Sequence, residues 1–222
     1  MNPPFTTDEF LSVFAAYNAA IWPFQIVAYG LGLVAVTAIF LPQHGLTRLA
    51  FAALAVLWAV TGIGYHLMFF AKINPIAPVF AALFVLQSVL FLVSAIRPGD
   101  LQLHLGPDVR SVAGLITLLY ALAIYPVLGV WAGHGLMAGP MFGVAPCPTT
   151  IFTIGILLIA RGTWVIWLSI IPFLWSLIGL AAAIQLGIPE DLGMPVAGAV
   201  LAGALVVQVH ATRHDNKARI RS

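Results

Sequence analysis

The sequence contains very little charge. Only 7% of its 222 residues are Asp, Glu, Lys or Arg, whereas 62% are apolar. This number of charged residues is too small to cover the surface of a soluble globular protein. The long apolar runs instead predict helices that cross a bilayer. The net charge of +2 comes mainly from a short C-terminal tail, not from a basic face, which argues against nucleic-acid binding.

Several cofactor classes lack the residues they need. A single cysteine excludes an internal disulfide and any metal site built from several cysteines. A retinal protein needs a lysine in its last helix, and the last predicted helix has none. Only His66 lies well inside a predicted span, which disfavours a bis-histidine haem, and the sequence indicates no particular cofactor. The segment 1–10 carries no basic residue, so we do not expect a cleavable signal peptide.

The apolar runs predict an all-α integral membrane protein with seven transmembrane helices. We expect one membrane domain over residues 1–222, made of an interfacial helix (6–20), a helix bundle (21–211) and a basic cytoplasmic tail (212–222). The expected spans are 21–41, 46–70, 75–96, 111–131, 148–160, 163–186 and 194–210. Pro126 and Pro172 fall inside two of them and are expected to kink those helices. No internal repeat is visible, so the inverted-repeat pattern of many transporters is missing.

The basic residues orient this bundle. Lys72 alone falls on one side, and the other basic residues fall on the opposite side: Arg48, Arg97, Arg110, Arg161, Arg213, Lys217, Arg219 and Arg221. Basic residues are enriched in cytoplasmic loops. The pattern therefore predicts a bacterial inner-membrane protein with its N-terminus outside and its C-terminus in the cytoplasm.

The N-terminal segment has the pattern of a capped helix. Thr6 and Glu9 form a capping-box pair, and large apolar residues recur at helical spacing from Phe10 to Ile21. Two interpretations remain open at this stage. The segment 6–20 is either an amphipathic helix on the outer surface of the membrane or an extension of the first span.

The fifth predicted span is too short to cross a bilayer. At about 1.5 Å per residue, Pro148 to Ala160 covers about 20 Å of a hydrocarbon core that is about 30 Å thick. The preceding segment has no helical pattern, so residues 137–148 are expected to form a re-entrant loop inside the bundle. Cys147 would then cap this helix, where the helix dipole favours a thiolate, a metal or an anion. The alternative is a buried, inert cysteine.

Most polar residues within the spans fall in the outer half, where they suggest a binding site. Apart from Arg48 at the cytoplasmic end of 46–70, no Asp, Glu, Lys or Arg lies inside a predicted span, which disfavours ion-coupled transport. Glu190 and Asp191 precede the last helix, where the helix dipole or Lys72 would stabilise them. The predicted ligand-binding residues are Tyr65, His66, Asn74, Cys147, Thr149, Trp175 and Ser176. His66 and Cys147, with His134 as a third ligand, are also candidates for a copper or zinc site.

These same stretches resemble a known family. They are Pro4-Phe5-Thr6 through Tyr17-Asn18, Trp22-Pro23, Tyr65-His66, Ile73-Asn74-Pro75, Phe142-Gly143, Pro146-Cys147-Pro148-Thr149, Phe152-Thr153, Trp175-Ser176-Leu177-Ile178-Gly179 and Asp191-Leu192-Gly193. In this order along nearly the whole chain, they resemble the bacterial multi-pass membrane proteins of the "domain of unknown function 6064" family. The resemblance implies the membrane fold and brings no activity with it.

Three functions remain compatible with the sequence. The leading hypothesis is an outward-facing polar cavity that binds or passes a small solute or a soft metal ion. The second is an intramembrane thiol enzyme with Cys147 as nucleophile or redox thiol and His66 as base, although no orienting carboxylate lies within a span. The third is an accessory subunit of a larger membrane complex. The lipid bilayer is the expected environment, and a membrane-protein partner or a homo-oligomer is compatible with each hypothesis.

Overall fold

The computed structural model describes residues 4–41, 43–135 and 137–221, with side chains placed as far as Gln208. The helices are α1 (Thr7–Ala20), α2 (Phe24–Phe40), α3 (His44–Ala59), α4 (Ala77–Ile96), α5 (Val109–Leu119), α6 (Tyr125–Trp131), α7 (Pro146–Ile159), α8 (Val165–Leu186) and α9 (Gly193–Arg221). Shorter π-helical and 3₁₀ segments are η1 (Val60–Phe69), η2 (Phe70–Lys72), η3 (Tyr120–Ile124) and η4 (Pro189–Leu192). Strands β1 (Gln102–Leu103) and β2 (Ala160–Arg161) form one short antiparallel pair. The all-α prediction is confirmed.

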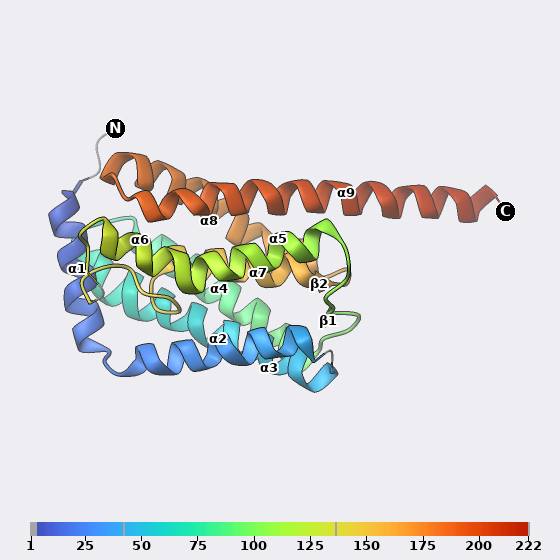
Figure 1. The fold of residues 1–222 in the computed structure, drawn as a ribbon, viewed down its shortest axis with the longest axis horizontal. Helices are drawn as coiled ribbons and strands as arrows, with labels where there is room; N and C mark the ends of the chain where they lie inside the picture. The colour runs from blue at the N-terminus through green and yellow to red at the C-terminus, as the bar shows by residue number, and fades with distance from the viewer. Residues whose placement is uncertain (1–3, 42, 136, 222) are drawn as a thin grey trace.

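Five helical segments in the described parts of the chain are long and apolar enough to cross a membrane. They are 44–72, 77–96, 109–131, 165–186 and 189–208. The bent pair of α1 and α2 makes a sixth if it is counted as one span. Pro172 lies inside the continuous helix α8, whereas the segment with Pro126 contains the π-helical turn η3 just before the proline. In Figure 1 the long helices run side by side along the molecule, with α1 across one end.

The N-terminal helix does not continue straight into the next helix. The axis of α1 lies at 88° to that of α2, so the chain turns sharply between the two helices. The predicted capping box is present, because Thr6 Oγ1 accepts from the Glu9 N–H and Glu9 accepts from the Thr6 N–H. One face of α1 buries Phe10, Phe14 and Tyr17 against the end of the bundle.

Helix α7 is completely enclosed. Its 14 residues span about 21 Å, too short to cross a bilayer alone, and every one of them is buried. Contacts with α5, α8 and α9 surround it, and Trp58 Nε1 of α3 donates to its Thr153 Oγ1 at 2.8 Å. The shortness that the sequence predicts therefore belongs to a helix that other helices cover on all sides.

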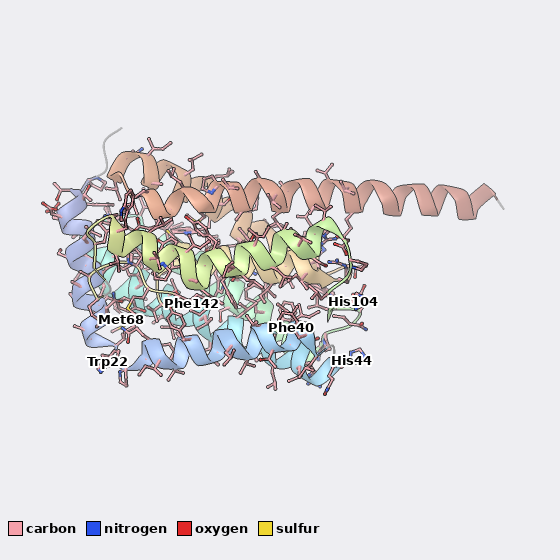
Figure 2. The ribbon with its side chains drawn as sticks, in the orientation of Figure 1. Trp22, Phe40, His44, Met68, His104 and Phe142 are labelled. Carbon is pink, nitrogen blue, oxygen red and sulfur yellow. The ribbon has the colours of Figure 1, made fainter. Side chains whose placement is uncertain are left out.

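The segment before α7 is non-helical and enters the bundle, but it is shorter than predicted. It covers residues 137–145, because 146–148 already belong to α7. From Gly139 to Ala145 it is largely buried. Phe142 points into the bundle (Figure 2), 4.8 Å from the ring of Phe152, and lies so close to Gly32 that a Cβ there would be 2.7 Å from it. A glycine on α2 thus makes room for this loop.

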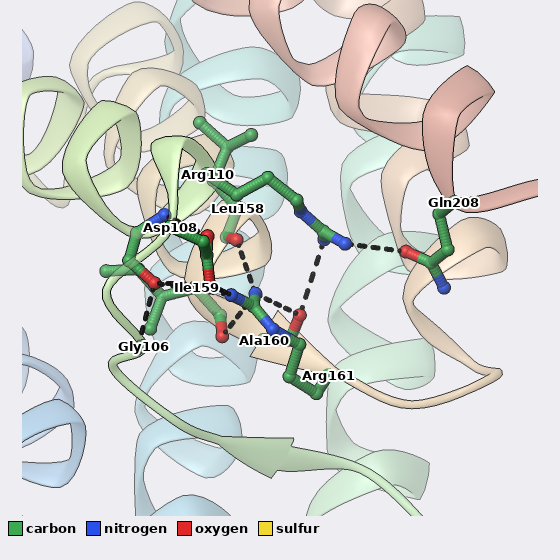
Figure 3. A network of polar contacts seen from close by, with 9 residues as sticks. Gly106, Asp108, Arg110, Leu158, Ile159, Ala160, Arg161 and Gln208 are labelled. Carbon is green, nitrogen blue, oxygen red and sulfur yellow. Dashed lines mark hydrogen bonds and ion pairs between the residues drawn. The ribbon is translucent and has the colours of Figure 1, made fainter. Parts of the chain in front are cut away.

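Arginines gather at the end of the bundle opposite α1. Figure 3 shows Arg161 donating to the carbonyl oxygens of Leu158 and Ile159, the last residues of α7, at 2.9 and 3.0 Å. A cation at this place satisfies free carbonyls and complements the helix dipole. Arg110 donates to Gln208 Oε1 of α9 at 2.9 Å, which joins the start of α5 to the last helix. His44 and His104 lie at this end in Figure 2, whereas Trp22 lies at the other.

The segment predicted as a basic tail is helical. The backbone of α9 continues as helix to Arg221, beyond the apolar stretch that ends at Gln208. The side chains beyond Gln208, including the basic ones, lie outside the described residues, as do Met1 to Pro3 and Ser222.

Asp108 connects the start of α5 to Arg161 at the end of the bundle opposite α1, and we expect its replacement to destabilise the fold. Asp108 is the N-cap of α5: it accepts from the Ser111 N–H at 2.9 Å and from Arg161 Nη2 at 2.6 Å. The backbone hydrogen bond from Ser111, assisted by Arg161, lowers the pKa of this carboxyl below its usual value. We expect Asp108→Ala to cost about 1 kcal/mol, as for other lost N-caps, and Asp108→Asn to cost less because it keeps a capping oxygen.

The same contacts predict the pH dependence of this effect. Because the folded-state pKa is lowered, the stabilisation is complete above the unfolded-state pKa and is lost as pH falls through the folded value. The stability difference between the parent and Asp108→Ala in thermal unfolding should therefore be largest at neutral pH and should shrink in acid as the Asp108 carboxyl becomes protonated. A difference that does not change with pH would contradict this role.

Candidate functional site

A cavity of about 270 Å³ lies at the α1 end of the bundle. Five of the predicted ligand-binding residues line it: Tyr65, His66, Asn74, Cys147 and Trp175. They come from η1, the turn before α4, α7 and α8, which lie far apart in the chain. The N-terminal segment adds Phe5 and Phe10 to the wall. Most of the wall is apolar, so the cavity is less polar than the sequence suggests.

His66 is fully buried and has no hydrogen-bond partner. It belongs to the π-helical segment η1, a local widening that often marks functional sites. Both ring nitrogens are buried, and neither forms a hydrogen bond. Its ring lies 5.1 Å from that of Trp175 and 4.8 Å from that of Phe84, so it is held by aromatic contacts alone. Buried polar atoms are nearly always satisfied, which makes these nitrogens binding candidates.

Two neighbours share this property. The hydroxyl of Tyr65 and Nε1 of Trp175 are buried without a partner. Tyr65 stacks on Phe14 of α1 at 4.5 Å, which fixes the ring and connects the cavity wall to the N-terminal helix. Trp175 packs edge-on against Phe80 of α4 at 5.1 Å. The three unsatisfied side chains therefore come from rigid, well-packed positions.

Cys147 lies in the first turn of α7, not at its cap. Ala145 is the N-cap and Pro146 is the first helical residue, so the helix begins two residues earlier than predicted. Proline suits this first position because its missing N–H would have no partner there. Cys147 is buried and lines the cavity, where its thiol lies beside the Asp191 carboxylate and the Trp175 indole.

Thr149 and Ser176 lie outside the cavity wall. Thr149 Oγ1 donates to the carbonyl of Ala145 at 2.6 Å, and Ser176 Oγ donates to the carbonyl of Phe173 at 2.6 Å. Both hydroxyls are thus satisfied within or beside their own helices. Asn74 does line the cavity, but its Oδ1 accepts from the Ile76 N–H and shapes the start of α4.

Asp191 is the site residue that the sequence did not predict as a ligand. It is buried, lines the cavity and accepts a short hydrogen bond from the hydroxyl of Tyr125. A carboxylate just before an apolar run is typical of a surface cap, and the pattern does not reveal that η4 folds back into the bundle. The one available signal is Pro189, which starts this inward 3₁₀ turn.

Glu190, the residue before Asp191, pairs with a histidine and not with the predicted Lys72. Glu190 Oε1 lies 2.7 Å from His134 Nδ1, and the Glu190 side chain is fully buried. Lys72 instead lies over the ring of Phe69, 4.6 Å from its centroid. His134 is therefore engaged by Glu190 and is absent from the cavity wall. Among the described residues, no group of three or more His, Cys, Asp or Glu side chains could hold a metal, so a site at His66 and Cys147 stays a prediction.

The comparisons with known proteins agree with the resemblance. No curated protein and no solved structure shows significant similarity to this chain. A model of a family of unknown function matches residues 7–219, a range that includes α1, the cavity residues from Phe10 onward and all the apolar spans. The chain belongs to this family of unknown function, DUF6064.

Proposed function

We propose that this protein spans the bacterial inner membrane seven times and uses the cavity at its α1 end to bind or pass a small solute. Helices α2 and α7 would add two spans to the five long ones, α7 with the help of the non-helical segment before it. The support for membrane insertion is the band of exposed apolar side chains around the bundle, such as Leu33, Ile116 and Val127. The arginine end would face the cytoplasm and the cavity would face outward.

One observation carries the binding proposal. His66, Tyr65 and Trp175 present buried, unsatisfied polar atoms to a single cavity. Such atoms cost free energy unless something pairs with them, and a bound molecule in the cavity would do so. Small-molecule sites have this composition: a mainly apolar wall with a few convergent polar groups.

A thiol enzyme is the second candidate, because Asp191 supplies a carboxylate that the predicted spans do not contain. Cys147, His66 and Asp191 all line the cavity. A nucleophilic cysteine needs a base, and here the Asp191 carboxylate lies beside the Cys147 thiol, whereas neither nitrogen of His66 has a hydrogen-bond partner. Activity lost in both Cys147→Ser and Asp191→Asn, with solute binding retained, would favour this candidate over simple binding.

The single cysteine is a built-in reporter of the cavity. We expect N-ethylmaleimide, which is small, neutral and membrane-permeant, to alkylate Cys147 in the folded protein. Ala181→Trp should slow this reaction at least tenfold, since Ala181 is an exposed residue of the cavity wall. Ile184→Trp is the matched control, because Ile184 lies on the same helix, is 68% exposed and is not part of the wall.

Two results would contradict the proposal. Alkylation only after denaturation would make Cys147 an inert core residue. Equal rates in parent and Ala181→Trp would show that the reagent does not reach Cys147 through this cavity.

A further inference from the structure

The unsatisfied atoms of the cavity are mainly hydrogen-bond donors. The indole N–H of Trp175 can only donate, the hydroxyl of Tyr65 can donate or accept, and a neutral His66 ring offers one donor and one acceptor. All three side chains are more than nine-tenths buried and line the cavity. A molecule that satisfies them must therefore carry at least one acceptor.

The charge of the wall excludes an anion as that acceptor. None of the described residues that line the cavity is Lys or Arg, and Asp191 is its one carboxylate. An anion would lie near a carboxylate in an apolar space without a compensating cation, which is costly. An ammonium group could approach Asp191, but this carboxylate already has the Tyr125 hydroxyl and the Cys147 thiol beside it, and the ammonium would leave the Trp175 and Tyr65 donors unpaired. The remaining class is a neutral molecule with an oxygen acceptor.

Most of the exposed residues of the cavity wall are apolar. Ile76 at the start of α4 and Ala181 on α8 are two of them, Ile76 with 56% of its surface exposed, whereas Gln185 on α8 is an exposed polar residue of the wall. The neighbouring exposed residues Val79 and Ile184 are apolar as well. A molecule dissolved in the lipid would meet these exposed apolar residues directly, whereas a strongly polar solute would not concentrate there.

From these observations we infer that the cavity takes a neutral, mainly apolar molecule with one carbonyl or hydroxyl oxygen, which enters from the lipid and accepts a hydrogen bond from Trp175. This ligand class rests on the proposed function, since it assumes that the cavity is a binding site. The volume of about 270 Å³ lies at the lower edge of the roughly 300–1,000 Å³ typical of ligand pockets, which favours a short chain or a single ring.

Four nine-carbon probes with different head groups test this inference: 2-nonanone, nonane, nonanoate and nonylammonium. Binding is measured by calorimetric titration into nanodiscs that contain the protein, with empty nanodiscs as the reference for partition into lipid. We expect 2-nonanone to bind most tightly. Trp175→Phe should lower the affinity for 2-nonanone about 3- to 10-fold, the range for one hydrogen bond. The ratio of the affinities for 2-nonanone and nonane should fall as well. Trp131→Phe is the control, since Trp131 is 81% exposed and outside the wall.

The outcomes separate the ligand class from the proposed function. Tighter binding of nonanoate or nonylammonium, abolished by Ala181→Trp, would overturn the neutral head group and leave the cavity as a binding site. If 2-nonanone and nonane bind with equal affinity and Trp175→Phe changes neither affinity, the hydrogen-bonded oxygen is also overturned, and the cavity remains a binding site. If no probe binds beyond the empty-nanodisc level, or if Ala181→Trp leaves all binding intact, both the ligand class and the cavity site are wrong.

Discussion

Replacing Gly155 with leucine is expected to separate α5 from α7 and to destabilise the protein by about 3 kcal/mol or more. The two helices touch through a pair of glycines. A Cβ on Gly155 would lie 2.8 Å from Leu118 Cγ and 3.0 Å from the Gly114 carbonyl oxygen, and a Cβ on Gly114 would lie 2.9 Å from the Gly155 carbonyl oxygen. Because backbone atoms limit the space, rotamer changes cannot relieve the clash.

Two helical glycines serve as matched controls for this substitution. At Gly30 and Gly203 an added Cβ would have no atom within 4 Å, so leucine meets open space at either site. We expect Gly30→Leu and Gly203→Leu to leave the unfolding midpoint unchanged or slightly raised, since glycine is a poor helix former. Unfolding of all variants in the same detergent compares them. A Gly155→Leu protein as stable as the controls would show that α5 and α7 do not pack this closely.

The second large effect is expected at the buried pair of His134 and Glu190. His134→Ala removes the partner of a fully buried carboxylate that lies 2.7 Å away, and such losses cost about 3–5 kcal/mol. Glu190→Gln in the same chain removes the charge that has become unpaired. The double variant should therefore recover part of the loss, which makes the two substitutions strongly non-additive.

Unfolding free energies of the two single variants, the double variant and the parent measure this coupling. His104→Ala is the control, since His104 is exposed and lies at the opposite end of the bundle (Figure 2). Simple addition of the two single effects would indicate that Glu190 is satisfied by other groups and that His134 only fills space.

The order of the helices follows well from the sequence because apolar runs and basic loops are local signals. The angle between α1 and α2 does not, since nothing in the run from Phe10 to Ile21 distinguishes a helix that continues from one that turns. The predicted start of α7 is two residues late because Pro146 and Pro148 both suit a first helical position.

The candidate site was predictable in part for a similar reason. Depth along a span places His66 and Cys147 at the same end, so their common cavity follows from simple helix geometry. Thr149 and Ser176 lie at the depth of the cavity but do not line it. Depth along a helix cannot show that their hydroxyls donate to backbone carbonyls instead. Asp191 was missed because its burial depends on the path of η4, a tertiary property.

The complete burial of α7 has a consequence for how the chain assembles. A helix of 14 residues is too short to cross a bilayer alone, and α7 is buried along its whole length, so its position depends on the helices around it. Two of those neighbours, α8 and α9, are synthesised after it. The bundle therefore cannot close around α7 until the last helix has left the ribosome, and a chain truncated before α9 would leave this central helix open on one side.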